Sequence, residues 1–222
     1  MTPGLSPVYA PPAGPVEILH ADAALVVANK PGGLLSVPGR GAGKEDCLAA
    51  RIGVDYPDAR IVHRLDMETS GLIVLARGAA MHRALSLAFQ ERRVTKRYIA
   101  VVDGLPLEAE GTIDLPLIAD WPNRPRQKVD HAVGKPSLTR WRLLERDRAR
   151  RQSRLALMPE TGRSHQLRVH LAAIGHAILG DPLYAPAEAR EQAPRLMLHA
   201  DFLAFVHPAS GRPLALACPP PF

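Results

Sequence analysis

The stretch RIVHRLDMETSGLIVLA, residues 60–76, joins a polar loop to an apolar strand. Thr69, Ser70 and Gly71 favour a tight turn at the junction, because small polar residues and glycine are typical of turns. Such a turn would hold Asp66 on a rigid element beside a strand, where a catalytic group can be kept in place. Taken alone, however, the pattern favours an aspartate that merely caps the turn or pairs with Arg64.

Around this stretch, short apolar runs are separated by polar turns. Met81, Leu85 and Phe89 recur every four residues and predict an apolar stripe on a helix over residues 79–92. Helices are also expected over residues 45–53 and 164–174, and strands over residues 24–28, 71–76, 96–102, 140–144, 154–158 and 197–206. Because strands outnumber helices and do not alternate with them regularly, the fold class is predicted as α+β, with a mixed, mainly antiparallel sheet flanked by helices.

The domain organisation follows from proline content and length. Of the 22 prolines in the 222 residues, five lie within residues 2–15, which contain little that could pack. We therefore expect a flexible segment over residues 1–16 and one catalytic domain over residues 17–222. The apolar surface is too evenly distributed to indicate a subunit interface, so a monomer is expected.

Charge and composition restrict the function classes. The net charge of +6 indicates a polyanionic partner. Neither a signal peptide nor an apolar stretch long enough to cross a bilayer is visible, and the two cysteines are far apart, so a cytoplasmic location is expected. The nine histidines form no metal-binding spacing and no Gly-rich phosphate loop occurs, so we expect no metal and no cofactor.

Several motifs together carry a family resemblance. The segment HRLDxxTSG, residues 63–71, resembles the signature of the RluA family of pseudouridine synthases. NKPGGL (29–34), KRYIA (96–100), TGRSHQLRVH (161–170), LGDPLY (179–184) and LHA (198–200) resemble further family motifs in the same order. The resemblance covers residues 18–218. It implies the pseudouridine synthase fold, with an active-site cleft across the sheet and no N-terminal RNA-binding domain of the S4 type.

The resemblance also assigns roles to individual residues. It implies that Asp66 is the catalytic nucleophile, attacking either C1′ of the ribose or the base. A guanidinium favours the charged form of a carboxylate, and the motif places Arg168 in that role; alone, Arg168 would be interpreted as a surface arginine facing solvent or Glu160. Tyr98 is expected to line the base pocket, although tyrosine is also common in half-buried strands. Arg64 is expected to occupy the space left by an extruded base, the alternative being a salt bridge to Glu68.

A basic loop follows the central strands. The segment DWPNRPRQKV, residues 120–129, places Arg124, Arg126 and Lys128 beside Trp121. This composition is typical of an RNA-contacting loop, with Trp121 either buried as an anchor or stacked on RNA, and the alternative is an ordinary solvated loop. The remaining candidates for RNA contact are His63, Arg40, Arg97, Arg163 and His165.

The expected function is the isomerisation of uridine to pseudouridine in structured RNA. The segment at residues 120–129 resembles the dual-specificity branch of the family, whose substrates are a tRNA anticodon stem-loop and a 23S rRNA stem-loop. A family member acting on another rRNA or tRNA site is the alternative within this class. Outside it, the basic charge alone would allow a non-catalytic RNA-binding module or another polyanion binder, which would not need Asp66.

Overall fold

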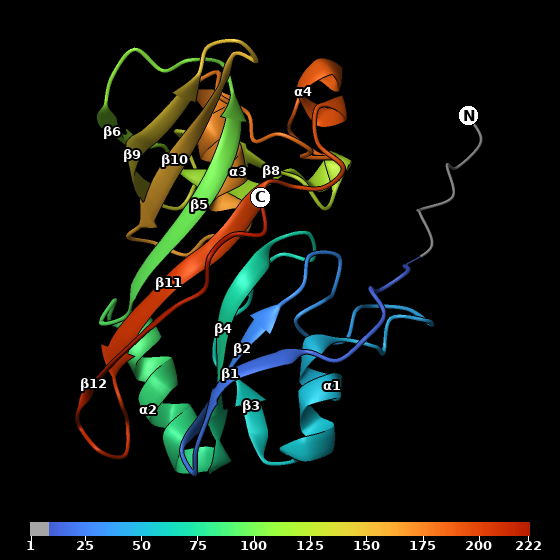
Figure 1. Ribbon diagram of the computed structural model, residues 1–222, viewed down its shortest axis with the longest axis vertical. Coiled ribbons are helices and arrows are strands. Elements are labelled where there is room, and N and C mark those ends of the chain that lie inside the picture. The colour runs from blue at the N-terminus through green and yellow to red at the C-terminus, as the bar shows by residue number, and fades with distance from the viewer. Residues whose placement is uncertain (1–8) are drawn as a thin grey trace.

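A ten-stranded sheet forms the body of the protein in the computed structural model, which describes residues 9–222 (Figure 1). The strand order is β1-β2-β4-β11-β5-β10-β9-β6, with β12 beside β11 and β3 beside β4. These strands are β1 (Glu17–Ala21), β2 (Leu25–Lys30), β3 (Ala59–Ile61), β4 (Ser70–Arg77), β5 (Thr95–Asp103), β6 (Glu110–Asp114), β9 (Leu138–Asp147), β10 (Gln152–Pro159), β11 (Leu198–Val206) and β12 (Pro213–Ala217). A separate hairpin is formed by β7 (Leu117–Ala119) and β8 (Gln127–Val129), joined through the short helix η1 (Trp121–Asn123).

Helices cover the two halves of this sheet. In Figure 1, α1 (Leu48–Asp55) and α2 (Gly78–Gln90) lie beside the lower half, and α3 (Gln166–Ala173) and α4 (Ala187–Glu191) belong to the upper half. The stripe predicted on residues 79–92 is confirmed, since Leu85 is buried and Met81 and Phe89 pack against the same cluster. The long strands β5 and β11 run diagonally through both halves and connect them (Figure 1).

The sheet changes direction at the strand that follows Asp66. Strand β4 pairs parallel with β11, through Ser70 with His199 and Gly71 with Ala200, whereas the other pairings between described strands are antiparallel. Gly71 has a φ of +111°, and a Cβ atom there would overlap the backbone of Ala200. Only glycine therefore allows this close approach, which fixes where the Asp66 loop enters the sheet.

The predicted fold class and the long elements are confirmed, and their ends shift by a few residues. Residue 92, expected within the second helix, has a positive φ of 58° and lies beyond its end. The short elements β1, β3, β6, β7, β8, β12 and α4 were not predicted. Their three to five residues carry too little periodicity to separate them from turns.

The expected flexible segment lies partly outside the described residues, since residues 1–8 are not described. The part that is described contacts α1 and the turn before it. Arg51 donates hydrogen bonds to the carbonyls of Pro12 and Gly14, and the Tyr9 hydroxyl donates to the carbonyl of Asp46. No helix within residues 9–222 is both long and apolar enough to cross a membrane.

Candidate active site

The loop that carries Asp66 is tied down on both sides of the aspartate. The hydroxyl of Ser36 donates to the carbonyl of Leu65 at 2.7 Å and accepts from its N–H at 3.2 Å. On the other side, Nζ of Lys30 donates to the carbonyl of Met67 at 2.9 Å. Because both residues that flank Asp66 are held, its carboxylate is presented from a rigid backbone.

Lys30 is an unusual support because its side chain is fully buried. Its ammonium also donates to the carbonyls of Pro31 at 2.9 Å and Leu34 at 2.7 Å, so one cation holds three backbone segments together. Burial lowers the pKa of Lys30 to about 7, against the opposing charges of Glu68 and Asp66. The motif NKPGGL thus supports the loop that carries Asp66.

Arg168 joins the two halves of the site. It lies on α3 with only 3% of its side chain exposed. Its Nε and Nη2 atoms donate to the two carboxylate oxygens of Asp181 at 2.8 and 2.7 Å, and its Nη1 donates to Asp66 at 3.3 Å. The hydrogen bonds and charges of the two aspartates outweigh burial and raise the pKa of Arg168 above its ordinary value, so the guanidinium stays charged.

Asp66 is therefore neither a turn cap alone nor a partner of Arg64. No ion pair joins Arg64 to Asp66 or to Glu68 within residues 9–222, and Glu160, the other partner considered for Arg168, instead accepts from Arg140 at 2.6 Å. The side chain of Asp66 remains 27% exposed, so its carboxylate is open to the cavity beside it.

A cavity of about 100 Å³, partly open to solvent, adjoins the carboxylate of Asp66. Its lining brings together the basic Lys96 and six of the predicted residues, namely Arg64, Asp66, Tyr98, Arg163, His165 and Arg168. Burial and the charge of Asp66 raise the pKa of Tyr98, so its hydroxyl stays protonated at neutral pH.

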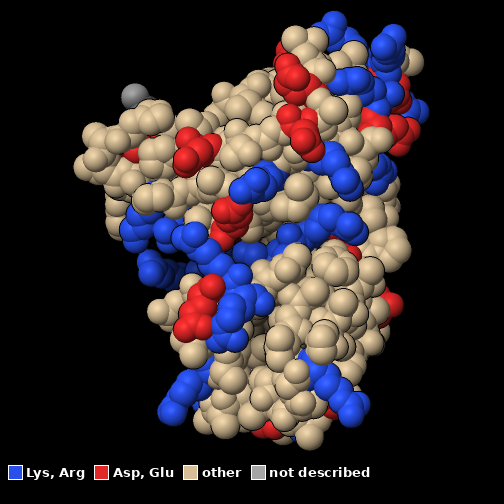
Figure 2. All heavy atoms as spheres, turned by 90° about the vertical axis from the view of Figure 1, so that its left-hand side faces the viewer, with Lys and Arg blue, Asp and Glu red and all other residues tan. Residues whose placement is uncertain are grey.

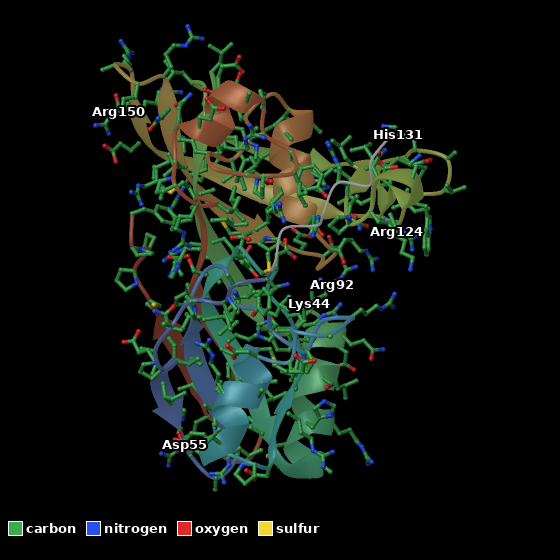
Figure 3. The ribbon with its side chains drawn as sticks, turned by 90° about the vertical axis from the view of Figure 1, so that its right-hand side faces the viewer. Lys44, Asp55, Arg92, Arg124, His131 and Arg150 are labelled. Carbon is green, nitrogen blue, oxygen red and sulfur yellow. The ribbon has the colours of Figure 1, made fainter. Side chains whose placement is uncertain are left out.

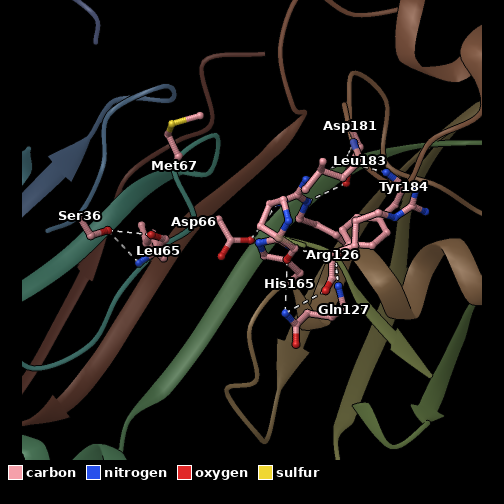
Figure 4. A network of polar contacts seen from close by, with 12 residues as sticks. Ser36, Leu65, Asp66, Met67, Arg126, Gln127, His165, Asp181, Leu183 and Tyr184 are labelled. Carbon is pink, nitrogen blue, oxygen red and sulfur yellow. Dashed lines mark hydrogen bonds and ion pairs between the residues drawn. The ribbon is translucent and has the colours of Figure 1, made fainter. Parts of the chain in front are cut away.

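A second network reaches this cavity from the β7–β8 hairpin (Figure 4). The Tyr184 hydroxyl contacts Nδ1 of His165 at 2.6 Å and accepts from the backbone N–H of Gln127 at 2.8 Å. The Tyr184 ring lies 5.3 Å from the guanidinium carbon of Arg126 and 5.1 Å from that of Arg168. Tyr184 and Asp181 received no role from the sequence, although both lie in the quoted motif LGDPLY.

The structure separates the expected RNA-contacting residues into two groups. His63 and Arg97 already have partners in the fold: Nε2 of His63 accepts from the N–H of Val74 at 3.1 Å, and Arg97 pairs with Asp201 at 2.6 Å. Burial lowers the pKa of His63 to about 3, so it is neutral. Arg40, Arg64, Arg124, Arg126, Lys128 and Arg163 are exposed.

The exposed cations lie around the cavity and on the β7–β8 hairpin. Figure 2 shows Lys and Arg side chains gathered along a hollow across the middle of one face, and a groove lined by Arg64, Arg92, Lys96 and Arg163 continues from the cavity. In Figure 3, Arg124 and His131 project outward from the hairpin. Of the two alternatives expected for Trp121, the buried anchor is wrong, because the residue is 64% exposed, with Arg124 stacked 4.4 Å from its ring centre.

The family model described as RNA pseudouridylate synthase matches residues 24–173. The chain belongs to this family. It is 52% identical over 215 residues to the dual-specificity RNA pseudouridine synthase RluA of Escherichia coli K12, covering 96% of this chain and 98% of that protein. It is 51% identical over 204 residues to the protein of the same name from Vibrio cholerae, covering 91% and 82%.

Solved structures of pseudouridylate synthases agree with this assignment. The human RNA pseudouridylate synthase domain containing 1 protein superposes with a TM-score of 0.78 at 31% identity, covering 100% of this chain and 87% of that one. The human domain containing 4 protein gives a TM-score of 0.73 at 27% identity, covering 92% and 88%. The chain is thus an RluA-type pseudouridine synthase, an enzyme that isomerises uridine to pseudouridine in RNA.

Proposed function

We propose that Asp66 is the nucleophile of this isomerisation and that Arg168 holds it ionised and oriented. The observation that carries the proposal is the ion pair of 3.3 Å between a partly open carboxylate and an arginine that Asp181 fixes from behind. A carboxylate held in this way can attack an electrophilic carbon or stabilise an electron-poor sugar. Tyr98, neutral and adjacent, offers a ring face and a hydroxyl to the uracil.

We also propose that the RNA substrates are a tRNA anticodon stem-loop and a 23S rRNA stem-loop. The support is 52% identity along almost the whole length of a dual-specificity relative, together with the basic β7–β8 hairpin that the sequence resemblance singled out. Arg64, exposed at the cavity, is suited to fill the position of an extruded base. A cytoplasmic, monomeric enzyme without a cofactor is part of the same proposal.

Tritium release from RNA labelled at uracil C5 tests both statements, because C5 loses its hydrogen when it becomes the glycosidic carbon. We expect wild type to release tritium from both stem-loops and Asp66→Ala to release none. Release by Asp66→Ala would remove Asp66 from its role and leave the reaction intact. Wild-type release from bulk rRNA and tRNA but from neither stem-loop would replace the proposed targets with another site.

A further inference from the structure

His165 has a backbone conformation that needs an explanation. It lies immediately before α3 with φ of 54° and ψ of 16°, in the left-handed region. A non-glycine residue is strained in this conformation, and such residues cluster at functional sites. Its side chain lines the same cavity as Asp66 and Tyr98. The strained backbone thus delivers an imidazole to the place where a base would lie.

The hydrogen bonds around Tyr184 determine which nitrogen of His165 carries the proton. A backbone N–H can only donate, so the Tyr184 oxygen accepts from Gln127. Burial raises the pKa of Tyr184, so the hydroxyl keeps its hydrogen. Within residues 9–222, Nδ1 of His165 is the acceptor available to that hydrogen, at 2.6 Å. The neutral imidazole therefore carries its own hydrogen on Nε2.

The Nε2–H group is free to bind a ligand. Nδ1 accounts for the only side-chain hydrogen bond of His165 among residues 9–222. No side-chain nitrogen or oxygen in this part of the chain is both fully buried and unpaired, so Nε2 is accessible. Burial is the main cause that lowers the pKa of His165, and with the charge of Arg168 it outweighs the opposing charges of Asp66 and Asp181, which favours a neutral ring. A neutral ring donates from Nε2 without adding a second full charge beside Asp66.

We propose that His165, held by Tyr184 and the β7–β8 hairpin, donates its Nε2–H to a carbonyl oxygen of the target uracil. When the bond between C1′ and N1 breaks, its electron pair passes to the uracil and spreads over N1 and the carbonyl oxygens. A fixed donor then stabilises the charge that develops during this step. This inference rests on the proposed site, and it makes His165 a catalytic residue and Tyr184 a positioning residue.

Replacing His165 by asparagine or by glutamine, which carry the same amide group, separates hydrogen-bond donation at the Nε2 position from structural support. Asparagine tolerates the left-handed conformation and can keep the contact with Tyr184, but its amide does not reach the Nε2 position. Glutamine places an amide N–H close to that position. We expect His165→Asn to lower the single-turnover rate about 100-fold with KM within about 2-fold of wild type. We expect His165→Gln to lie within about 10-fold of the wild-type rate, and circular-dichroism melting checks that both variants fold.

Substrates with a single sulfur test the contact itself. In RNA with 2-thiouridine or 4-thiouridine at the target position, one carbonyl oxygen becomes a weak acceptor, and product is measured by nucleoside chromatography. One of the two thiouridine substrates should react much more slowly than uridine with the wild-type enzyme. With His165→Asn the same substrate should react only slightly more slowly than uridine, because that variant has already lost the contact. Tyr184→Phe should lower the rate about 10-fold at unchanged KM, because the proton is then free to occupy either ring nitrogen.

Equal losses in His165→Asn and His165→Gln, or equal slowing of wild type and His165→Asn by both thiouridines, would overturn the proposal. Bulk tRNA and rRNA tritiated at C5 serve as substrate if neither stem-loop is modified. Failure of the proposed RNA targets is then distinguishable from failure of this inference. Activity of wild type with inactivity of Asp66→Ala confirms that the site itself operates under the conditions used.

Discussion

Replacing Asp181 by asparagine tests how Arg168 is held. Oδ1 of Asp181 accepts from Nη2 of Arg168 at 2.7 Å and from the backbone N–H groups of Leu183 and Tyr184 at 2.8 and 3.1 Å. Oδ2 accepts from Nε of Arg168 at 2.8 Å. Asparagine keeps one oxygen for the first three bonds and places an NH₂ group against Nε–H. One charge-assisted hydrogen bond is lost, and two donors then face each other.

The magnitude follows from burial, since Asp181 and Arg168 expose 1% and 3% of their side chains. Removing one partner of a buried ion pair costs about 3–5 kcal/mol, and a hydrogen bond to a charged group contributes about 1.5–3 kcal/mol. Because asparagine keeps one oxygen and its three hydrogen bonds, we expect Asp181→Asn to lower the free energy of unfolding by about 2–4 kcal/mol. For a domain of this length, that lowers Tm by about 5–15 °C.

Asp181→Asn should lower the reaction rate by more than its loss of stability alone would explain. Without the second carboxylate, the guanidinium of Arg168 is drawn toward Asp66 and displaces it from the attacking position. We expect the single-turnover rate at 20 °C, where the variant is folded, to fall about 100-fold with KM nearly unchanged. Asp201→Asn is the matched control, because Asp201 is 8% exposed and pairs with Arg97, a residue that does not line the cavity.

Calorimetry and tritium release decide the outcome. Asp201→Asn should lower Tm and keep the wild-type rate, whereas Asp181→Asn should lower both. If Asp181→Asn melts within 2 °C of wild type, or retains the wild-type rate, then Asp181 does not hold Arg168 as the contacts indicate. A similar loss of rate in both variants would mean that destabilisation alone explains it.

Three further predictions concern the support of the site and its RNA contacts. Lys30 has a pKa of about 7 in the fold, so above pH 7 the unfolded chain binds more protons than the folded one. The free energy of unfolding of wild type, measured by urea titration relative to Lys30→Met, should therefore rise by about 3 kcal/mol from pH 6 to 9. A difference that stays constant with pH would contradict this. Arg126→Ala should reduce the slope of log affinity against log salt by about 1. Arg97→Ala should leave that slope unchanged in filter binding, because Arg97 pairs with Asp201; an equal reduction would place it on the RNA. Gly71→Ala should abolish soluble expression, since its Cβ would overlap Ala200; a folded variant would refute the close approach.

The sequence predicted the parts of the site that are local in the chain. Residues 63–71 predicted a turn followed by a strand, because both depend on near neighbours. The turn lies earlier than expected, closed by the N–H of Thr69 on the carbonyl of Asp66, while Ser70 and Gly71 already belong to β4. The role of Asp66 itself came from the family resemblance. Arg168 and Tyr98 came from motif resemblance, and the cavity brings both beside Asp66. Asp181 and Lys30 were missed as supports, because their function depends on burial, and burial of a charged side chain is visible only once its partners are in place.

Trp121 and His63 show what residue type leaves open. Trp121 was expected either as a buried anchor or stacked on RNA, and its exposure with a cation on its face excludes the first. His63 stays a candidate for RNA contact because it lines the groove beside the cavity, although its ring stacks on Phe89 at 4.4 Å and accepts a backbone hydrogen bond. In both cases the chain direction after a short turn decides which side a residue faces, and sequence alone does not specify that direction.

The division of the site between two halves of the sheet explains why its supports are so strong. Asp66 enters from the β3–β4 loop and Arg168 from α3, 102 residues later, so a single ion pair of 3.3 Å has to define their relative position. A partly exposed pair of this length contributes little rigidity by itself. Lys30 and Ser36 therefore fix the loop on one side, and Asp181 fixes the guanidinium on the other. With both partners immobilised separately, the pair can remain open enough for a nucleotide to approach without losing its alignment.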